Sequence, residues 1–290
     1  MKRWTKWTLI SVFAMMMTVL MVGSCMDFRM KPEQADAHFA AHAVTPHFQS
    51  YQHEGRRMNY VSVGDPTKPL VLFVHGSPGS WSAFIDFLTN SRLLEVAQVA
   101  SVDRPGFGDS DFGKPEGSME RQASDIAPIL AANQSGRPAI LVGHSLGGPV
   151  IARMAMDYPD QVGGLVLVSA SIDPQLEKTK WYQIPADWMV FSWMVPQVLV
   201  TTNREILPLK SELEKMIPLW KNLHMPVTVI QGGKDNLVPP GNADFAEKML
   251  VNAPTFMVRE PEMNHFVPWN RPELIEQAVL HHLKLLPAGP

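Results

Sequence analysis

Short apolar segments alternate with longer segments of helical periodicity from about residue 58 to the end of the chain. Apolar runs such as LVLFV and GLVLVS are typical of strands that helices cover on both faces. The pattern predicts strands at Met58–Val63, Leu70–Val74, Val96–Val102, Ala139–Val142, Leu165–Ser169, Val227–Gln231 and Thr255–Arg259. It predicts helices at Ser118–Ala132, Leu146–Tyr158, Asn242–Leu250 and Pro272–Leu285. This alternation predicts an α/β fold with a mostly parallel central sheet and helices on both faces.

The alternation stops between about residues 173 and 223, where large apolar side chains mix with prolines and no strand is predicted. The tryptophans of this segment are Trp181, Trp188, Trp193 and Trp220. We interpret residues 173–223 as a helical cap inserted into a core formed by residues 48–172 and 224–290. Most of the cap's large side chains are expected to form its own core, and a few to face a pocket for an apolar substrate, because ligand pockets favour domain interfaces.

The first 24 residues have the pattern of a signal peptide or membrane anchor, with basic residues before an apolar stretch that ends in small residues. The following Cys25 completes the stretch VGSC, which resembles the bacterial lipoprotein lipobox. The resemblance implies a lipid on Cys25 and an exported protein, anchored to a membrane on the periplasmic or extracellular side. Residues 25–47 are polar and rich in alanine and histidine, and we interpret them as a tether.

The tether contains His38, His42 and His47, for which two interpretations exist. Histidines are frequent metal ligands, but no flanking carboxylates or second cluster complete a site here. Solvated linker histidines are the plainer interpretation. We therefore predict no metal.

The overall composition is ordinary for a globular protein, with a formal net charge of -3 and 18% charged residues. No long run of one charge sign suggests a nucleic-acid surface, so we do not expect nucleic acid as a partner. The single cysteine excludes an intramolecular disulfide. The oligomeric state cannot be read from this pattern.

The candidate nucleophile is Ser145, in the segment AILVGHSLGG, where a buried strand is expected to run directly into a helix. A serine on such a tight turn needs small neighbours, and Gly143 and Gly147 flank it. The turn projects the hydroxyl beyond the carboxyl edge of the sheet. Since Gly-x-Ser-x-Gly also occurs by chance, the expected strand and helix around it carry the argument.

A serine hydroxyl needs a base within hydrogen-bond reach, usually a histidine whose second nitrogen contacts a carboxylate. Asp235 follows a predicted strand in the segment QGGKDNLVPP, and His265 follows the last predicted strand in PEMNHFVPWN. We predict His265 as general base and Asp235 as the acid that orients it. Asp173, after another strand, is the alternative acid. His144 is expected to pack against the turn rather than act as the base.

Five motifs in the order HGSPGS, DRPGFGDS, GHSLGG, GGKDNLVP and MNHF resemble those of the α/β-hydrolase superfamily, in its capped serine hydrolase branch, from about residue 48 to the end. The resemblance implies an α/β-hydrolase fold and an oxyanion hole formed by the backbone N–H groups of Ser77 and Leu146. It assigns His75 to shaping the first of these loops. Asp103 and Arg104 are expected to fix a loop by ion pairing.

These residues predict a serine hydrolase that acts on a small or medium carboxylic ester through an acyl-enzyme intermediate, without a cofactor. Haloalkane dehalogenases and the related epoxide hydrolases have aspartate at the turn, so Ser145 argues against both activities. Hydrolysis of C–C, aminoacyl, lactone or thioester bonds on the same triad remains an alternative. A binding protein that keeps the scaffold without turnover is the alternative from another class.

Overall fold

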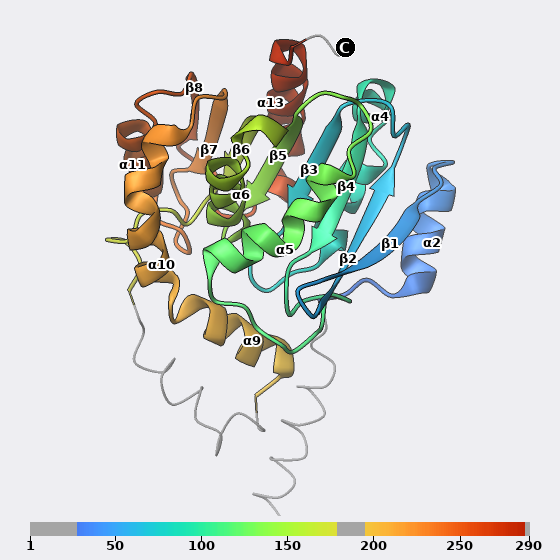
Figure 1. Ribbon diagram of the computed structural model, residues 1–290, viewed down its shortest axis with the longest axis horizontal. Helices are drawn as coiled ribbons and strands as arrows, with labels where there is room; N and C mark the ends of the chain where they lie inside the picture. The colour runs from blue at the N-terminus through green and yellow to red at the C-terminus, as the bar shows by residue number, and fades with distance from the viewer. Residues whose placement is uncertain (1–27, 179–194, 288–290) are drawn as a thin grey trace, which may run out of the picture.

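The structure, a computed structural model, describes residues 28–178 and 195–287, which contain an eight-stranded sheet with helices against both faces (Figure 1). The strand order is β1-β2-β4-β3-β5-β6-β7-β8. β2 pairs antiparallel with β1 and with β4, and the remaining pairs are parallel. The carboxyl ends of β3 to β8 therefore share one edge of the sheet, where the loops that follow them gather.

The bounds of the elements follow the chain. The strands are β1 (His47–His53), β2 (Arg56–Val63), β3 (Leu70–Val74), β4 (Gln98–Asp103), β5 (Ala139–His144), β6 (Val162–Val168), β7 (Val227–Gly232) and β8 (Thr255–Glu260). The α-helices are α2 (Pro32–Ala41), α3 (Ile85–Leu88), α4 (Ser91–Val96), α5 (Met119–Ala131), α6 (Gly147–Asp157), α9 (Gln197–Ile206), α10 (Leu209–Met216), α11 (Gly241–Met249), α12 (Val267–Asn270) and α13 (Pro272–Leu285). Short 3-10 helices lie at η1 (Trp81–Phe84), η2 (Pro159–Gln161) and η3 (Ile217–Asn222).

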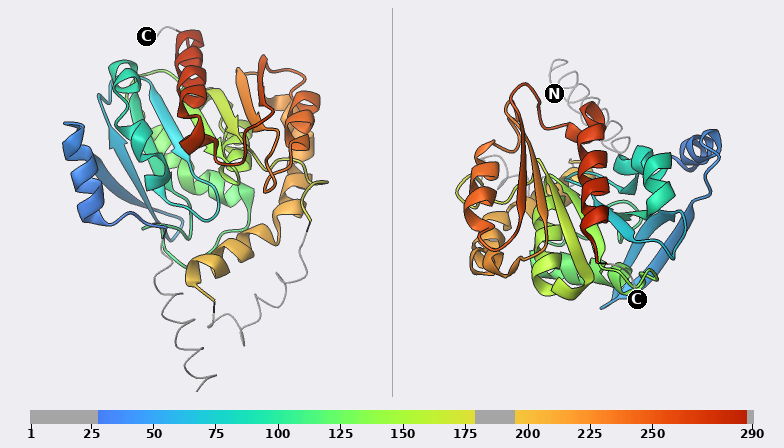
Figure 2. Two further views of the ribbon diagram at one scale, coloured as in Figure 1. Left: turned by 180° about the vertical axis from the view of Figure 1, so that it is seen from behind. Right: turned by 90° about the horizontal axis from the view of Figure 1, so that it is seen from above.

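Successive strand residues point to opposite faces of the sheet and enter two separate apolar cores. In β3, Leu72 belongs to one core and Phe73 to the other. Helices α5, α6, α10 and α11 cover the first core, whereas α2, α3, α4 and α13 cover the second. Seen from behind, α4 and α13 lie in front of the sheet (Figure 2). Double coverage explains why the central strands are almost wholly apolar in sequence.

The expected α/β architecture, with a mostly parallel sheet and helices on both faces, is confirmed. The predicted strands correspond to β2 to β8, although Val96 closes α4 and β4 starts only at Gln98. β1 was not predicted, because most of its residues are polar and exposed at the sheet edge. Backbone pairing with β2 runs along all seven residues of β1, and Tyr51 packs against the first core.

The interpretation of residues 25–47 as a tether is wrong for the part that the structure describes. Residues 32–41 form α2, which places Ala35 and Phe39 in the second core. The Phe39 ring stacks on the Trp81 ring with centroids 6.1 Å apart, and it contacts the Phe48 ring edge-on with centroids 6.5 Å apart. Two buried side chains four residues apart lie on one face of a helix. Because these two residues suffice to pack α2 against the core, the segment has no long apolar pattern that would predict a helix.

The segment interpreted as a cap contains α9, α10 and η3 in its described part. Trp220 is buried and packs edge-on against Phe245 of α11, with ring centroids 5.8 Å apart. It therefore belongs to the core rather than to a pocket. Trp181, Trp188 and Trp193 lie outside the described residues.

The predicted signal peptide or anchor and the lipidation site Cys25 also lie outside the described residues, so both stay predictions. Within residues 28–178 and 195–287, no helix has the length and apolar character needed to cross a membrane.

Candidate active site

Ser145 lies on the turn between β5 and α6, with a backbone φ of 55°. A residue other than glycine is strained in this left-handed conformation, at a cost of about 1–3 kcal/mol. The turn is also crowded: a Cβ on Gly147 would lie 2.2 Å from the Val74 carbonyl oxygen. A Cβ on Gly143 would lie 2.4 Å from the carbonyl oxygen of Gly147. The glycines that flank Ser145 in sequence are therefore required by this geometry.

Asp235 and His265 come together at the carboxyl edge of the sheet, on the loops after β7 and β8. His265 Nδ1 lies 2.8 Å from Asp235 Oδ2, and both side chains are buried. The other oxygen, Asp235 Oδ1, accepts hydrogen bonds from the backbone N–H groups of Leu237 at 2.9 Å and Val238 at 2.8 Å. These bonds lock the carboxylate in one orientation toward the histidine.

The surroundings of Asp235 favour its ionised form. Burial raises its pKa, but the bond with His265 and the two backbone N–H groups outweigh this effect, so the pKa is lowered overall. An ionised carboxylate can only accept a hydrogen bond, so His265 must carry its proton on Nδ1. This tautomer leaves a lone pair on His265 Nε2, which is the state that a general base requires.

Ser145 and His265 line one cavity of about 510 Å³, together with the loop that contains Ser77. The remaining lining residues near its mouth are mostly apolar and include Phe28, Leu237, Phe266 and Trp269. Each of these four side chains is between 46% and 64% exposed. The cavity therefore combines a few polar groups at its base with an apolar rim, as ligand pockets commonly do.

His144 packs beneath this pair. Its ring lies 4.7 Å from the His265 ring, and its Nε2 lies 3.0 Å from the His265 carbonyl oxygen, to which it donates. Burial lowers the pKa of His144 to about 3, and the neighbouring His265 is the second largest cause of this shift. A neutral, buried ring whose donor is occupied supports the backbone of His265, which is the packing role predicted for His144.

His75 is also fully occupied, which argues against a role as base. Its Nε2 accepts from the backbone N–H of Arg104 at 3.0 Å, and its Nδ1 donates to the Gly76 carbonyl at 2.6 Å. Burial and the adjacent Arg104 guanidinium hold the pKa of His75 well below its usual value. The ring therefore stays neutral and shapes the loop after β3.

The two backbone positions expected to form an oxyanion hole are Ser77, on the loop after β3, and Leu146, directly after Ser145. Leu146 is the N-cap residue of α6, where N–H groups lack helical partners. Ser77 follows Gly76, and a Cβ on Gly76 would lie only 2.8 Å from the Ser145 Cβ. The loop after β3 thus approaches Ser145 so closely that only glycine fits at position 76.

Asp173, the alternative acid, is engaged elsewhere. Its side chain accepts from the Gln175 N–H at 2.9 Å, and its backbone N–H donates to Asn242 Oδ1. The structure therefore pairs His265 with Asp235 and not with Asp173.

The expectation of ion pairing in the DRPGFGDS loop is correct only for Arg104, whose partner is Glu205 at 2.7 Å. Asp103 instead accepts hydrogen bonds from the backbone N–H groups of Trp81 at 2.7 Å and Asp109 at 2.9 Å. Burial raises the pKa of Asp103 to about 7. Glu205 was missed in sequence, because a glutamate on an amphipathic helix normally faces solvent.

The three histidines of the expected tether form no metal site in the described residues, which contain no cluster of three or more potential protein ligands. His38 lies on α2 and His42 is the C-cap residue of this helix, with the two ring centroids 4.5 Å apart. His47 begins β1.

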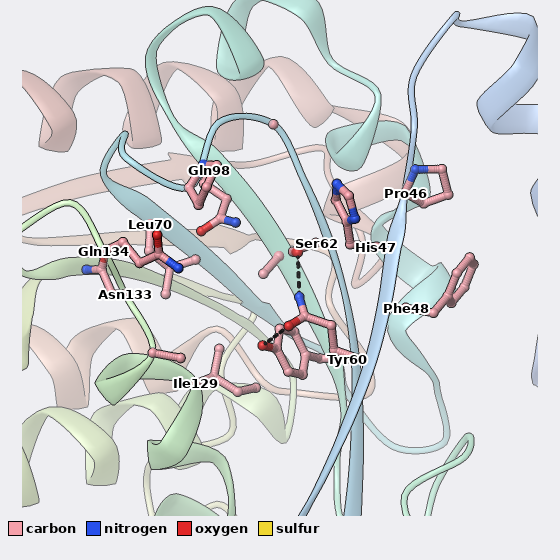
Figure 3. Close-up of a pocket in the computed structure, with 15 residues that line it drawn as sticks. Pro46, His47, Phe48, Tyr60, Ser62, Leu70, Gln98, Ile129, Asn133 and Gln134 are labelled. Atoms are coloured by element: carbon pink, nitrogen blue, oxygen red, sulfur yellow. Dashed lines mark hydrogen bonds between the residues drawn. The ribbon is translucent and has the colours of Figure 1, made fainter.

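A second cavity of about 690 Å³ lies between β1, β2 and the end of α5 (Figure 3). Three of its polar side chains bond to one another: the Tyr60 hydroxyl donates to Gln49, which donates to Ser62. Leu70 and Gln98, which also line it, begin β3 and β4. This cavity is therefore at the amino ends of the parallel strands, away from Ser145.

Comparison with known proteins agrees with this architecture. Residues 69–199 match the family model described as alpha/beta hydrolase fold. The chain is 28% identical over 158 residues to epoxide hydrolase 1 of Caenorhabditis elegans, a match that covers 51% of this chain and 38% of that protein. It is 36% identical over 109 residues to the sn-1-specific diacylglycerol lipase ABHD11 of Mus musculus, covering 37% and 34% respectively. The matches thus span little more than a third of these curated relatives.

The likeness to solved structures extends over nearly the whole chain. A membrane phospholipase A, a bacterial virulence factor, is similar with a TM-score of 0.65 at 18% identity, covering 98% of this chain and 99% of its own. The chain therefore has the α/β-hydrolase fold, that of the superfamily its motifs resemble.

Proposed function

We propose that this protein is a serine hydrolase that cleaves a small or medium carboxylic ester through an acyl-enzyme. The observation that carries the proposal is the 2.8 Å contact between His265 and Asp235, at a cavity that Ser145 also lines. A nucleophile, a base and an acid that orients the base are the components of acyl transfer by serine. The similarity to a diacylglycerol lipase over part of the chain supports an ester as the substrate.

In the first half of the reaction, Ser145 Oγ attacks the ester carbonyl carbon while His265 Nε2 accepts the hydroxyl proton. Asp235 stabilises the imidazolium that forms. The negative charge on the carbonyl oxygen is stabilised by the N–H groups of Ser77 and Leu146. When the tetrahedral intermediate collapses, the C–O bond to the alcohol breaks and His265 returns the proton to the leaving oxygen.

In the second half, water attacks the acyl-enzyme and His265 accepts a proton from it. The second tetrahedral intermediate collapses to release the carboxylic acid, and the proton returns to Ser145 Oγ. The same two N–H groups stabilise the oxyanion in both halves. Losing one such donor typically costs about 3 kcal/mol in the barrier.

The serine at the turn distinguishes this proposal from the activity named for one of the relatives. The chain is similar to an epoxide hydrolase over 158 residues. Epoxide hydrolases related to this fold have aspartate at the turn, whose carboxylate attacks the epoxide, whereas Ser145 requires a base and forms an acyl ester. The apolar rim of Phe28, Leu237, Phe266 and Trp269 supports a substrate with an apolar acyl or alcohol group.

The test is labelling of the purified protein with a fluorophosphonate probe, together with turnover of p-nitrophenyl acetate and butyrate. We expect labelling in the wild type and its loss in Ser145→Ala and His265→Ala. Turnover should fall by at least about 10³-fold in both variants, because the triad acts as a unit.

Asp173→Asn is the matched control, since this carboxylate lies in the loop after the neighbouring strand β6 but contacts Gln175 rather than His265. It should retain labelling and turnover. A folded wild-type protein that neither reacts with the probe nor hydrolyses either ester would reject the proposal in favour of a non-catalytic binding protein.

A further inference from the structure

Arg104, the residue directly after β4, is fully buried and uses every N–H of its guanidinium group. Its Nε donates to the His75 carbonyl at 2.8 Å, and its Nη2 donates to the Gly76 carbonyl at 2.9 Å. Its remaining donors bind Gln122 of α5 at 2.9 Å and both carboxylate oxygens of Glu205 at 2.7 and 3.1 Å. The side chain thus joins the loop after β3 to α5 and α9.

The two contacts with Gly76 have a direct geometric consequence. The Gly76 carbonyl accepts from Arg104 Nη2 and from His75 Nδ1. This carbonyl belongs to the same planar peptide unit as the Ser77 N–H, and the two groups point in opposite directions. Two donors that hold the oxygen therefore also fix the direction of the Ser77 N–H. Hydrogen bonds to the carbonyl additionally polarise the peptide and strengthen its N–H as a donor.

Helix α9 contacts this loop directly through Thr202 and indirectly through Glu205, which binds Arg104. Glu205, whose side chain is 1% exposed, binds the Arg104 guanidinium, and Thr202 lies one turn earlier. The Ser77 hydroxyl donates to Thr202 Oγ1 at 3.1 Å. Burial of the Glu205 carboxylate costs free energy unless a cation pairs with it. The position of α9 and the position of the Arg104 side chain therefore depend on each other.

We propose that Arg104 is a positioning residue that directs the Ser77 N–H at the nucleophile, and that Glu205 makes this orientation depend on helix α9. The inference rests on the proposed function, which assigns the Ser77 N–H to the oxyanion. Arg104 lies beneath the loop and acts through the Gly76 carbonyl. Arg104 should therefore stabilise the transition state, in which the oxyanion forms, and have little effect on the affinity for the substrate.

The variant that tests this is Arg104→Lys in the full chain. Lysine keeps the positive charge but replaces the planar fork with three donors on one atom, so it cannot reach Glu205, Gln122 and both carbonyls at once. We expect kcat for p-nitrophenyl butyrate to fall about 10- to 100-fold, when activity is counted per site that reacts with the fluorophosphonate. This fall is smaller than the one caused by complete loss of an oxyanion donor. KM should change by less than about twofold. Affinity for a trifluoromethyl ketone, which forms an oxyanion with Ser145, should fall in parallel.

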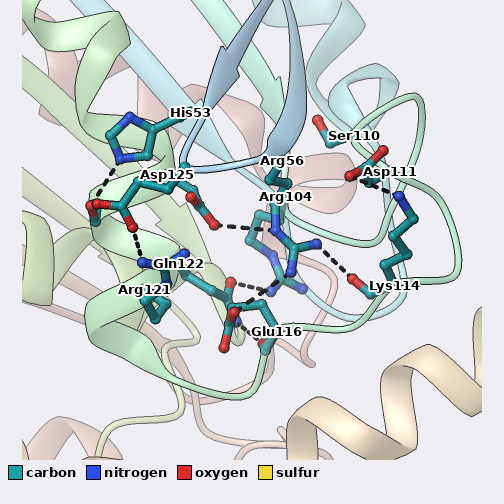
Figure 4. A network of polar contacts seen from close by, with 12 residues as sticks. His53, Arg56, Arg104, Ser110, Asp111, Lys114, Glu116, Arg121, Gln122 and Asp125 are labelled. Carbon is teal, nitrogen blue, oxygen red and sulfur yellow. Dashed lines mark hydrogen bonds and ion pairs between the residues drawn. The ribbon is translucent and has the colours of Figure 1, made fainter.

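Arg56→Lys is the matched control, because Arg56 belongs to the same polar network as Arg104 but is linked to it only through Glu116 and Gln122 (Figure 4). It donates to the Lys114 carbonyl and pairs with Glu116 and Asp125, away from the loop after β3. This variant also loosens an arginine network and should leave kcat and ketone affinity at the wild-type values.

A structural readout separates this inference from the proposed function. Exchange of the Ser77 amide proton, followed by NMR, should be faster in Arg104→Lys than in the wild type, whether or not the protein hydrolyses esters. Glu205→Gln should shift kcat and exchange in the same direction by less, and it decides the matter if Arg104→Lys does not fold. Folded variants with wild-type kcat and unchanged Ser77 exchange would overturn the inference while leaving the triad intact.

Discussion

At the scale of single residues, the histidines around Ser145 differ in role because their hydrogen-bond partners differ. His75, His144 and His265 are all buried, but only His265 binds a carboxylate. The other two donate to backbone carbonyls, and burial holds their pKa values low. Environment therefore decides which histidine can act as a base, since an isolated imidazole would be equally suitable at each position.

Asp235 carries a pH-dependent part of the stability, which Asp235→Asn should reveal. Its pKa is lower in the folded protein than its ordinary value of 3.8, so the unfolded state binds more protons in the range just below that value. The contribution is fully present above about pH 4 and is lost as the pH falls through the folded pKa. We expect the difference in free energy of unfolding between wild type and Asp235→Asn to be largest above about pH 4 and to shrink in acid.

Urea unfolding at a series of pH values from 3 to 8 measures this difference. A difference that stays constant over the range, or grows in acid, would contradict the lowered pKa. Parallel labelling with the fluorophosphonate at neutral pH would report the separate effect on the reaction.

At the scale of secondary structure, the elements that position the site were predictable where their apolar pattern is local. β5, the turn at Ser145 and α6 are contiguous in sequence, and the turn's glycines follow from its crowding. α2 was missed because it is stabilised by a residue distant in sequence, since Phe39 is buried against Trp81. β1 was missed for a different reason: most of its residues are polar and exposed, so it lacks the apolar pattern of a strand although it pairs with the adjacent β2.

Docking of α2 predicts that Phe39→Ala destabilises the domain. Removing a buried phenylalanine ring typically costs about 3–5 kcal/mol, through lost transfer free energy and the cavity left behind. Urea unfolding should show this loss, whereas Asp36→Ala, an exposed substitution on the same helix, should stay within about 0.5 kcal/mol of wild type. Equal stability of the two variants would restore the interpretation of this segment as a tether.

At the scale of the whole molecule, the cavity at Ser145 is assembled from segments that the sheet topology brings together. Phe28 precedes the first described helix, Ser77 follows β3, Leu237 follows β7, and Phe266 and Trp269 follow β8. Parallel strands direct their following loops to a single edge, so the loops after β3, β7 and β8 share one cavity, which Phe28 also lines. The apolar rim exists only in this assembled state.

The rim predicts a preference for longer acyl chains that Phe266→Ala should weaken. Phe266 lines the cavity and is 49% exposed, so it offers apolar surface to a substrate. Burial of one methylene group contributes about 0.8 kcal/mol, so the ratio of kcat/KM for p-nitrophenyl hexanoate over acetate should fall about three- to tenfold. Leu285→Ala, an equally exposed apolar position on α13, should leave the ratio unchanged. An unchanged ratio in Phe266→Ala would mean that the acyl chain binds elsewhere.

The strands from β2 to β8 and the turn at Ser145 could be predicted because each depends on a pattern within about ten residues, and their succession along the chain predicted the fold class and the order of Ser145, Asp235 and His265. Which carboxylate contacts His265, where α2 docks and which helix binds Arg104 depend on tertiary packing. Arg104 and Glu205 are 101 positions apart, and nothing near either residue in sequence indicates the other. The physical reason is that a buried charge is stable only beside its partner, and the packing of the whole chain decides which partner that is.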